Sequence, residues 1–188
     1  MNDANEPSFE LTKLQAAQRQ LSGAIRLLFD DEDPVLVHTI AGAASILFSD
    51  LIENAAPHKS WDKQAQEANG LDAAEYFRIM REYQNFLKHA KDDPDAKLVF
   101  KPVETEAIIF WAVMNASEIA PMSNEAQVFQ LWYVASHSPQ EIVDINTKFQ
   151  QILAEFGDLR NLARADRLKC GAQALAPLLQ LPPEQEQQ

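Results

Sequence analysis

Apolar residues recur at helical spacing along most of the chain, and the breaks between these segments fall at proline, glycine or acidic residues. From about Phe9 to Phe29, apolar side chains return every three or four positions, the period of an amphipathic helix. Six further segments show this period: about Pro34 to Asn54, Leu71 to Ala90, Glu104 to Ile119, Ser123 to Ser136, Ser138 to Phe156, and Leu159 to Ala176. The pattern predicts an all-α, single-domain helical bundle of six or seven helices over residues 1–180, followed by a disordered polar tail at 181–188.

Several boundaries carry specific signals. Asp33-Pro34 is a helix start, because aspartate caps the first backbone amides and proline fits the first helical position. Ser138 to Glu141 reads as a capping box with proline in its first turn. We expect Pro177 to stop the last helix, Pro57 to Gly70 to form a loop with one helical turn, and Lys97 to Lys101 to be the only extended segment.

The segment from Pro34 to Asn54 is apolar on two faces, so we expect it at the centre of the bundle, together with the segments that begin at Glu104 and Ser123. A third face carries small or polar residues and would let another backbone approach closely. This face consists of His38, Gly42, Ser45 and Ser49. Because one bundle covers all three faces only by enclosing the helix completely, the pattern also predicts a symmetric homodimer.

Composition narrows the functional classes. The 188 residues include 46% hydrophobic residues and carry a net charge of −12, which argues against a general binder of nucleic acids or anionic membranes but leaves room for a local basic site. The polar, acidic N-terminus is unlike a signal peptide. The apolar run from Ala107 to Met114 is shorter than the roughly 20 residues of a membrane span. With one cysteine, Cys170, the chain is expected to be a soluble protein of a reducing cytoplasm, without membrane contact.

Most catalytic signatures are missing from the sequence. Five scattered glycines cannot build a phosphate-binding loop or a dinucleotide fingerprint, and no nucleophile elbow occurs. The four histidines have neither the Glu-x-x-His nor the His-x-x-x-His spacing of helical metal sites. We therefore expect no cofactor and no bound metal.

One helix carries a group of polar residues that merits functional consideration. If residues 71–90 form a single helix, Arg78, Glu82, Asn85 and His89 lie opposite its apolar face, and Arg81 and Lys88 lie at the edge. Such a face is either a solvated helix surface or a site that meets a ligand or a second subunit. As a site, it offers His89, Asn85 and Arg81 as catalytic candidates and Lys88 and Arg78 as binding candidates.

The segment Gln84-Asn-Phe-Leu-Lys-His89 resembles the signature of the HEPN superfamily, in which arginine is followed after four to six residues by histidine, often with asparagine directly after the arginine. Members of this all-α group place the motifs of two subunits in a dimer cleft and cleave RNA without a metal. Asn85 and His89 match the pattern, whereas Gln84 occupies the arginine position. The block from Asn85 to Asp95 is also similar to one in uncharacterised bacterial proteins.

This resemblance implies an RNA-directed role in bacterial stress or defence. His89 would act as general acid or base, Asn85 would orient phosphate or His89, and Arg81 or Lys88 would balance phosphate charge. Because Gln84 lacks the guanidinium charge, we expect weak ribonuclease activity that Gln84→Arg would raise. The alternative is a non-enzymatic helical module that dimerises or binds a protein or a small apolar ligand, which the acidic charge favours.

Other conspicuous residues have structural interpretations. His38 lies in an apolar helix and is expected to be a packed, hydrogen-bonded residue of the core or of an interface. His137 precedes a helix cap and would mark a turn. Arg160, Arg164 and Arg167 recur at helical spacing near acidic residues, which is typical of a salt-bridged face.

Overall fold

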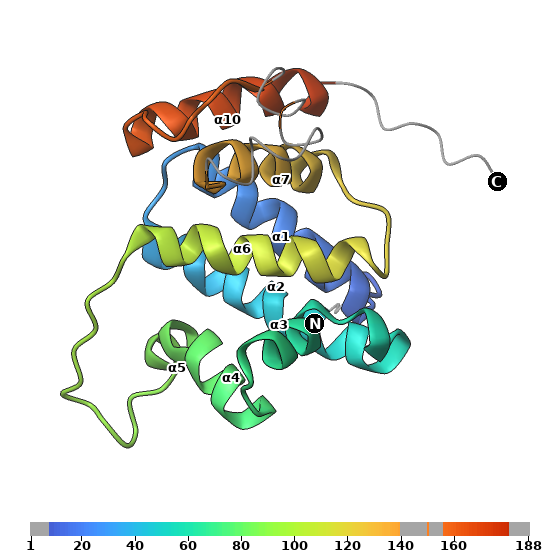
Figure 1. Ribbon diagram of the computed structural model, residues 1–188, viewed down its shortest axis with the longest axis vertical. Coiled ribbons are helices and arrows are strands. Elements are labelled where there is room, and N and C mark those ends of the chain that lie inside the picture. Colours follow the sequence, from blue (N-terminus) through green and yellow to red (C-terminus); the bar gives the residue numbers. More distant parts are fainter. Residues whose placement is uncertain (1–7, 140–149, 151–155, 181–188) are drawn as a thin grey trace, which may run out of the picture.

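The structure, a computed structural model, describes residues 8–139, 150 and 156–180 (Figure 1). Over these residues it is a single all-α domain with eight α-helices, one 3-10 turn and no strand. The helices are α1 (Lys13–Phe29), α2 (Pro34–Ala55), α3 (Trp61–Asn69), α4 (Ala73–Met80), α5 (Glu82–Lys88), α6 (Pro102–Ser117), α7 (Asn124–His137) and α10 (Arg164–Leu179), with the 3-10 turn η1 (Pro57–Lys59). The predicted fold class is confirmed.

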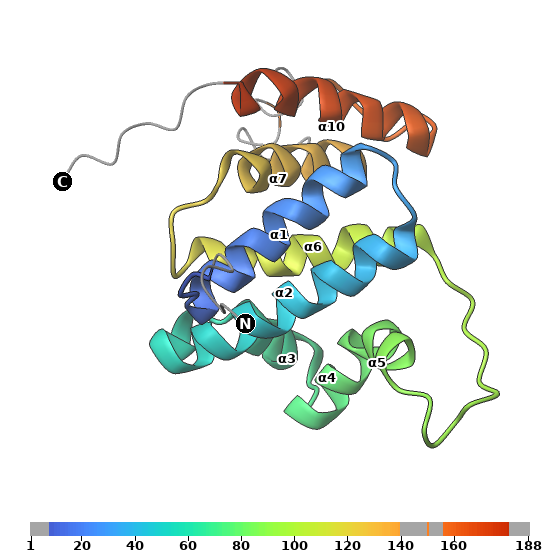
Figure 2. The same cartoon turned by 180° about the vertical axis from the view of Figure 1, so that it is seen from behind.

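An antiparallel pair, α1 and α2, forms the middle of the domain, and a short turn joins the two helices. Figures 1 and 2, which view the domain from opposite sides, show α6 crossing this pair on one side. α7 lies beside α1 and α6, and α10 covers α7 from outside. The short helices α3, α4 and α5 gather at the opposite end of the domain from α10.

The core is continuous across α1, α2, α6, α7 and α10. Trp132 is fully buried at its centre, and its indole Nε1–H donates to the carbonyl of Arg167 at 2.6 Å, which ties α7 to α10. The Phe29 ring packs edge-on against the Trp132 ring at a centroid distance of 5.4 Å. The helices predicted to be central, α2, α6 and α7, do carry many buried residues, and α1 contributes six more, so it belongs to the interior equally.

Helix starts follow their capping residues. The Asp33 carboxylate accepts the Val35 backbone N–H at 2.8 Å, as its position before Pro34 predicts. α1 begins at Lys13 rather than near Phe9, because Thr12 and Gln15 form a capping box there. Ser123 caps α7 through the Ala126 N–H.

Two boundary predictions are wrong. The expected loop of residues 57–70 contains the nine-residue helix α3, which Ser60 caps and which ends at Gly70 with φ of 64°. Pro177 lies inside α10, which continues to Leu179. Residues 97–101, expected to be extended, form no helix and pair with no strand among the described residues, and Lys101 is extended with φ of −114° and ψ of 119°. The helix expected from Ser138 to Phe156 and the polar tail at 181–188 fall largely or wholly outside the described residues.

The helix predicted over residues 71–90 is also wrong, because it is broken at Arg81, whose backbone has φ of −106° and ψ of 8°. The break lets two helices follow different neighbours. In α4, the buried Tyr76 hydroxyl donates to the Asp62 carboxylate of α3 at 2.8 Å. In α5, the buried Gln84 side chain lies against Gly42 of α2. The short helices α4 and α5 therefore pack on α3 and α2 respectively.

α2 is long and apolar enough, by length and composition, to cross a membrane, the only such helix among the described residues. The core helix of a soluble protein passes the same test. Eight residues of α2 are buried in this bundle, including three members of its small and polar face, His38, Gly42 and Ser49. α5 and α6 cover that face within the chain, through Gln84 on Gly42 and Thr105 on His38. The outer apolar face remains partly exposed, with Leu36 at 49%.

Two glycine substitutions should change the free energy of unfolding in opposite directions. Gly171→Ala places a methyl group on α10 where the Phe29 ring already lies, and such overpacking costs about 1–3 kcal/mol, more than the ~1 kcal/mol gained in helix propensity. Gly23→Ala meets no atom within 4 Å and should stabilise α1 by about 0.5–1 kcal/mol. Urea denaturation of both variants measures the difference. Equal shifts would show that α10 does not pack closely on α1.

Candidate functional site

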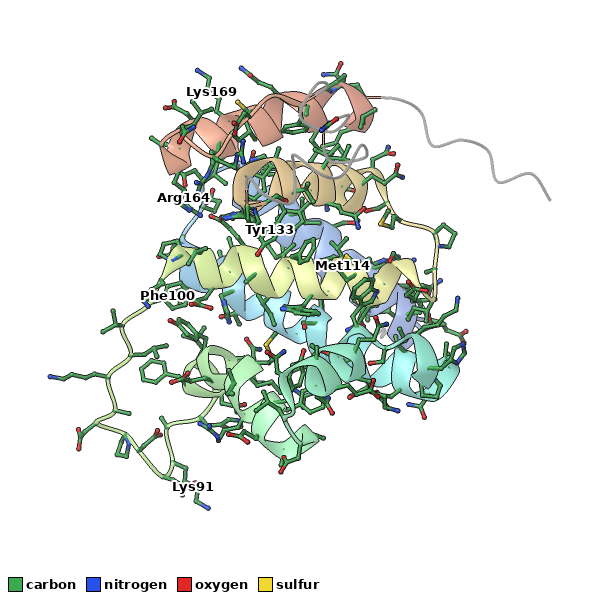
Figure 3. All side chains as sticks on the ribbon, in the orientation of Figure 1. Lys91, Phe100, Met114, Tyr133, Arg164 and Lys169 are labelled. Atoms are coloured by element: carbon green, nitrogen blue, oxygen red, sulfur yellow. The ribbon has the colours of Figure 1, made fainter. Side chains whose placement is uncertain are left out.

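A shallow hollow of about 620 Å³ lies over α4, α5 and the long connection to α6. Three of the five candidate residues from the sequence line it: Arg78, Asn85 and His89. The other lining residues are Glu82, Phe86, Asp92, Asp93, Lys97 and Leu98. Figure 3 shows the connection running away from the bundle through Lys91 and returning at Phe100. The hollow therefore combines one helix pair with an exposed loop.

The three candidates come from different local structures. Arg78 lies in the last turn of α4, and Asn85 lies in the middle of α5. His89 follows the last residue of α5 in an extended conformation, and its backbone N–H donates to the Asn85 carbonyl at 3.0 Å. All three residues are exposed. The end of α5 thus directs the imidazole toward solvent beside the connection, rather than along a helix face.

The structure separates Arg81 and Lys88 from this hollow. Arg81 is half-buried, and its guanidinium stacks on the Phe77 ring at 4.2 Å. It lines a small cavity of about 20 Å³ beside Asp62 and Gln84. Lys88 is exposed and does not line the hollow. Both residues were expected at the edge of the polar face of one continuous helix. The helix breaks at Arg81, so that arrangement does not form.

Gln84, at the position of the HEPN arginine, is buried against α2, whereas His89 is exposed. Its side chain is buried at 2% exposure, and its Nε2 donates to the Thr39 carbonyl at 3.4 Å. Its Oε1 has no hydrogen-bond partner. A Cβ on Gly42 would overlap the Gln84 amide, so the glycine leaves room for it. In this chain, position 84 is a packing position against α2.

The charges around the hollow are mixed. Arg78 and Lys97 supply two cations, whereas Glu82, Asp92 and Asp93 supply three carboxylates. Phosphate recognition depends on cationic side chains, and each carboxylate nearby opposes it. The hollow can therefore contact a small number of phosphates, and it does not provide a long basic track.

A second polar cluster, which the sequence analysis missed, surrounds Glu106 of α6. The Glu106 carboxylate is fully buried and accepts hydrogen bonds from His137 Nε2 and Arg164 Nε, each at 2.9 Å. Arg167 NH2 lies 3.9 Å from the same carboxylate, and Arg164 also pairs with Asp31 at 3.1 Å. In Figure 3, Arg164 lies between α10 and the start of α6. The cluster thus joins α6, α7, α10 and the turn after α1.

Charge and hydrogen bonding control the protonation of Glu106. Burial by itself raises the pKa of the Glu106 carboxyl group, but hydrogen bonds from His137 and Arg164, and their positive charges, bring it below its usual value. Arg160, Arg164 and Arg167 are ion-paired as expected but do not form one helix face, because Arg160 precedes α10 and pairs with Asp158, whereas Arg164 and Arg167 meet Glu106. The signal in the sequence was a carboxylate directly before the apolar run that begins at Ala107. His137, expected to mark a turn, ends α7 and belongs to this cluster.

His38 is packed and hydrogen-bonded, as its apolar helix predicts. It is 2% exposed, and its Nδ1 lies 3.3 Å from the Thr105 hydroxyl of α6. Burial lowers the pKa of His38 to about 4, so the imidazole is neutral at neutral pH. The rings of Tyr83 and Phe100 pack against it with centroid distances of 5.6 Å.

Comparison of the chain with protein-family models, curated proteins and solved structures finds no match. The described residues contain no group of three or more histidine, cysteine or acidic side chains placed to hold a metal ion.

Proposed function

We propose that this chain is a HEPN-like helical protein of the bacterial cytoplasm that binds RNA through the hollow over α4 and α5, in a stress or defence role. One observation carries the proposal: Arg78, Asn85 and His89 line the same hollow although they come from two helices and a helix end. The all-α fold is compatible with it. Homodimerisation, which the resemblance implies, is part of the proposal.

Each side chain has a distinct chemical role in this proposal. The Arg78 guanidinium binds a phosphate through paired N–H donors, a role first expected of Arg81. The Asn85 amide orients the phosphate or the His89 ring. The His89 imidazole accepts a proton from a ribose 2′-hydroxyl or donates one to the leaving oxygen, because imidazole performs both roles near neutral pH. Three carboxylates around the hollow and the buried Gln84 favour weak cleavage.

Arg78→Ala should weaken the binding of a short single-stranded RNA about tenfold, because it removes a charge-assisted phosphate contact. Lys88→Ala is the matched control, since Lys88 is an exposed cation in α5 that does not line the hollow, and it should change the affinity less than twofold. His89→Ala should abolish whatever cleavage the parent shows. Fluorescence anisotropy measures binding, and gel analysis in the presence of chelator measures cleavage.

Equal effects of Arg78→Ala and Lys88→Ala would mean that RNA binding depends on overall charge and not on this hollow. Cleavage that persists in His89→Ala would remove the helix end from the reaction. Light scattering at micromolar concentration tests the dimer, and a sharp monomer mass would exclude a cleft between two subunits.

A non-enzymatic interaction module is the second candidate function. The observation that favours it is the outer face of α2, where Val35 and Leu36 are 40% and 49% exposed. Apolar side chains on a helix surface are suited to contact with another protein or a second copy of the chain. Failure of the parent to bind or cleave RNA, together with a dimer in solution, would favour this function over the first.

A further inference from the structure

A second cavity, distinct from the hollow, lies between α2, the α4–α5 pair and α6, and has a volume of about 430 Å³. That volume lies within the usual range for sites that bind small molecules. Its lining residues are His38, Ile79, Met80, Glu82, Tyr83, Lys101, Glu104, Ala107, Ile108 and Trp111. Glu82 lines both this cavity and the hollow, so the two lie on either side of α5.

The Thr105 hydroxyl has one proton and lies 3.3 Å from both the Pro34 carbonyl and His38 Nδ1, so the acceptor it chooses sets the tautomer of His38. The Thr105 hydroxyl donates to the Pro34 carbonyl at 3.3 Å. When the hydroxyl donates to Pro34, its oxygen accepts a hydrogen bond from Nδ1–H of the neutral imidazole, the arrangement on which the inference below is based. The Nε2 atom of His38 consequently keeps a lone pair.

That Nε2 atom is buried and has no hydrogen-bond partner. A buried acceptor without a donor costs about 1–3 kcal/mol, so an unpaired imidazole nitrogen in a cavity wall needs an explanation. A ligand with an N–H group would satisfy it. Because the atom is covered, the ligand reaches it by shifting a neighbouring ring. Tyr83 is one such ring: it packs on His38, and its hydroxyl makes one long hydrogen bond of 3.3 Å to the Val99 carbonyl.

The other walls favour a positive charge on a flat apolar body. The charged residues that line the cavity are two carboxylates, Glu82 and Glu104, and one cation, Lys101. Burial is the largest cause that raises the pKa of Tyr83, and the negative charges of Glu104 and Glu82 raise it further. Trp111 and Tyr83 offer aromatic faces to a cation, and Ile79 and Ile108 offer apolar surface.

We propose that this cavity binds a small organic cation with a flat apolar body, whose N–H group donates to His38 Nε2 and whose charge faces Glu104 and Glu82. The ligand class follows from the unpaired acceptor, the two carboxylates and the aromatic walls. The proposal does not rest on RNA binding at the hollow, although Glu82 borders both sites.

Benzamidine is a suitable probe, because it combines an aromatic ring with a planar amidinium. Titration followed by NMR should give saturable shifts at His38 and Trp111. Benzamide, the neutral analogue, should bind about tenfold more weakly, and benzoate should not bind, since both lose the attraction to the carboxylates.

Glu104→Gln should weaken benzamidine binding about five- to tenfold and leave benzamide binding unchanged. Glu118→Gln is the matched control, because Glu118 directly follows the last residue of α6 and does not line the cavity. His38→Phe should weaken both probes, and a circular dichroism spectrum checks its folding. Absence of saturable binding, equal binding of benzoate, an unchanged benzamidine affinity in Glu104→Gln, or an unchanged affinity in a folded His38→Phe would each overturn the proposal.

Discussion

Glu106→Gln should lower the free energy of unfolding by about 3 kcal/mol, the largest expected effect of a single change that preserves side-chain volume. Removing one partner of a buried ion pair typically costs about 3–5 kcal/mol. The lower end applies here, because His137, Arg164 and Arg167 keep side-chain exposures of 21%, 29% and 16%. Urea denaturation gives the value. Glu118→Gln, which breaks an exposed pair with Lys59, should cost less than about 1 kcal/mol.

The difference between the parent and Glu106→Gln should shrink in acid. The pKa of Glu106 is lowered in the folded state, so its contribution is fully present above the ordinary carboxyl value of 4.5 and is lost as pH falls through the folded value. The groups that face it are His137, Arg164, Arg167 and Tyr133, with Asp31 behind Arg164. Neutral His38 also titrates in acid, but it does so equally in both proteins. A difference that stays constant from pH 7 to pH 3 would contradict the role of the ionised carboxylate.

Gln84→Arg should destabilise the protein by about 3 kcal/mol instead of raising RNA cleavage. The side chain at position 84 is 2% exposed and lies against Gly42, so a longer, charged group must either be buried or displace α5 from α2. Burying a charge without a well-placed partner costs several kcal/mol. Chemical denaturation measures the loss, and cleavage by the folded fraction should not exceed that of the parent.

Gln84→Met is the matched control for this substitution. It keeps the volume and removes the Oε1 acceptor that has no partner, so it should leave the stability within about 1 kcal/mol of the parent. A stable Gln84→Arg with enhanced cleavage would show that position 84 faces His89, as the HEPN pattern implies.

The helical spacing of apolar residues was the sequence feature that predicted the fold best. Asp33, Pro34 and Ser123 mark boundaries that the structure confirms, since capping depends on residues adjacent in the chain. The boundaries that failed depended on packing. Pro177 lies near the end of α10, and residues 61–69 form a helix whose Trp61 N–H donates to Asn115 of α6 at 3.0 Å.

The candidate site could be predicted in part. The sequence brought Arg78, Asn85 and His89 together on one face, and the structure keeps them around one hollow for a different reason. They lie together because α5 ends at Lys88 and the chain turns there, not because they share a helix face. Arg81 does not line the hollow, because the helix break falls at this residue and its guanidinium stacks on the Phe77 ring.

The sequence by itself determined the all-α class and the identity of most helices, because the period of apolar residues and the capping residues act over one or two turns. The tertiary structure decided that the helix breaks at Arg81, that Gln84 packs against α2, and that Glu106 forms the ion pair with Arg164. Glu106 and Arg164 are separated by 58 residues, and Thr39 and Gln84 by 45. Contacts over such separations depend on how helices pack, and local spacing carries no information about them.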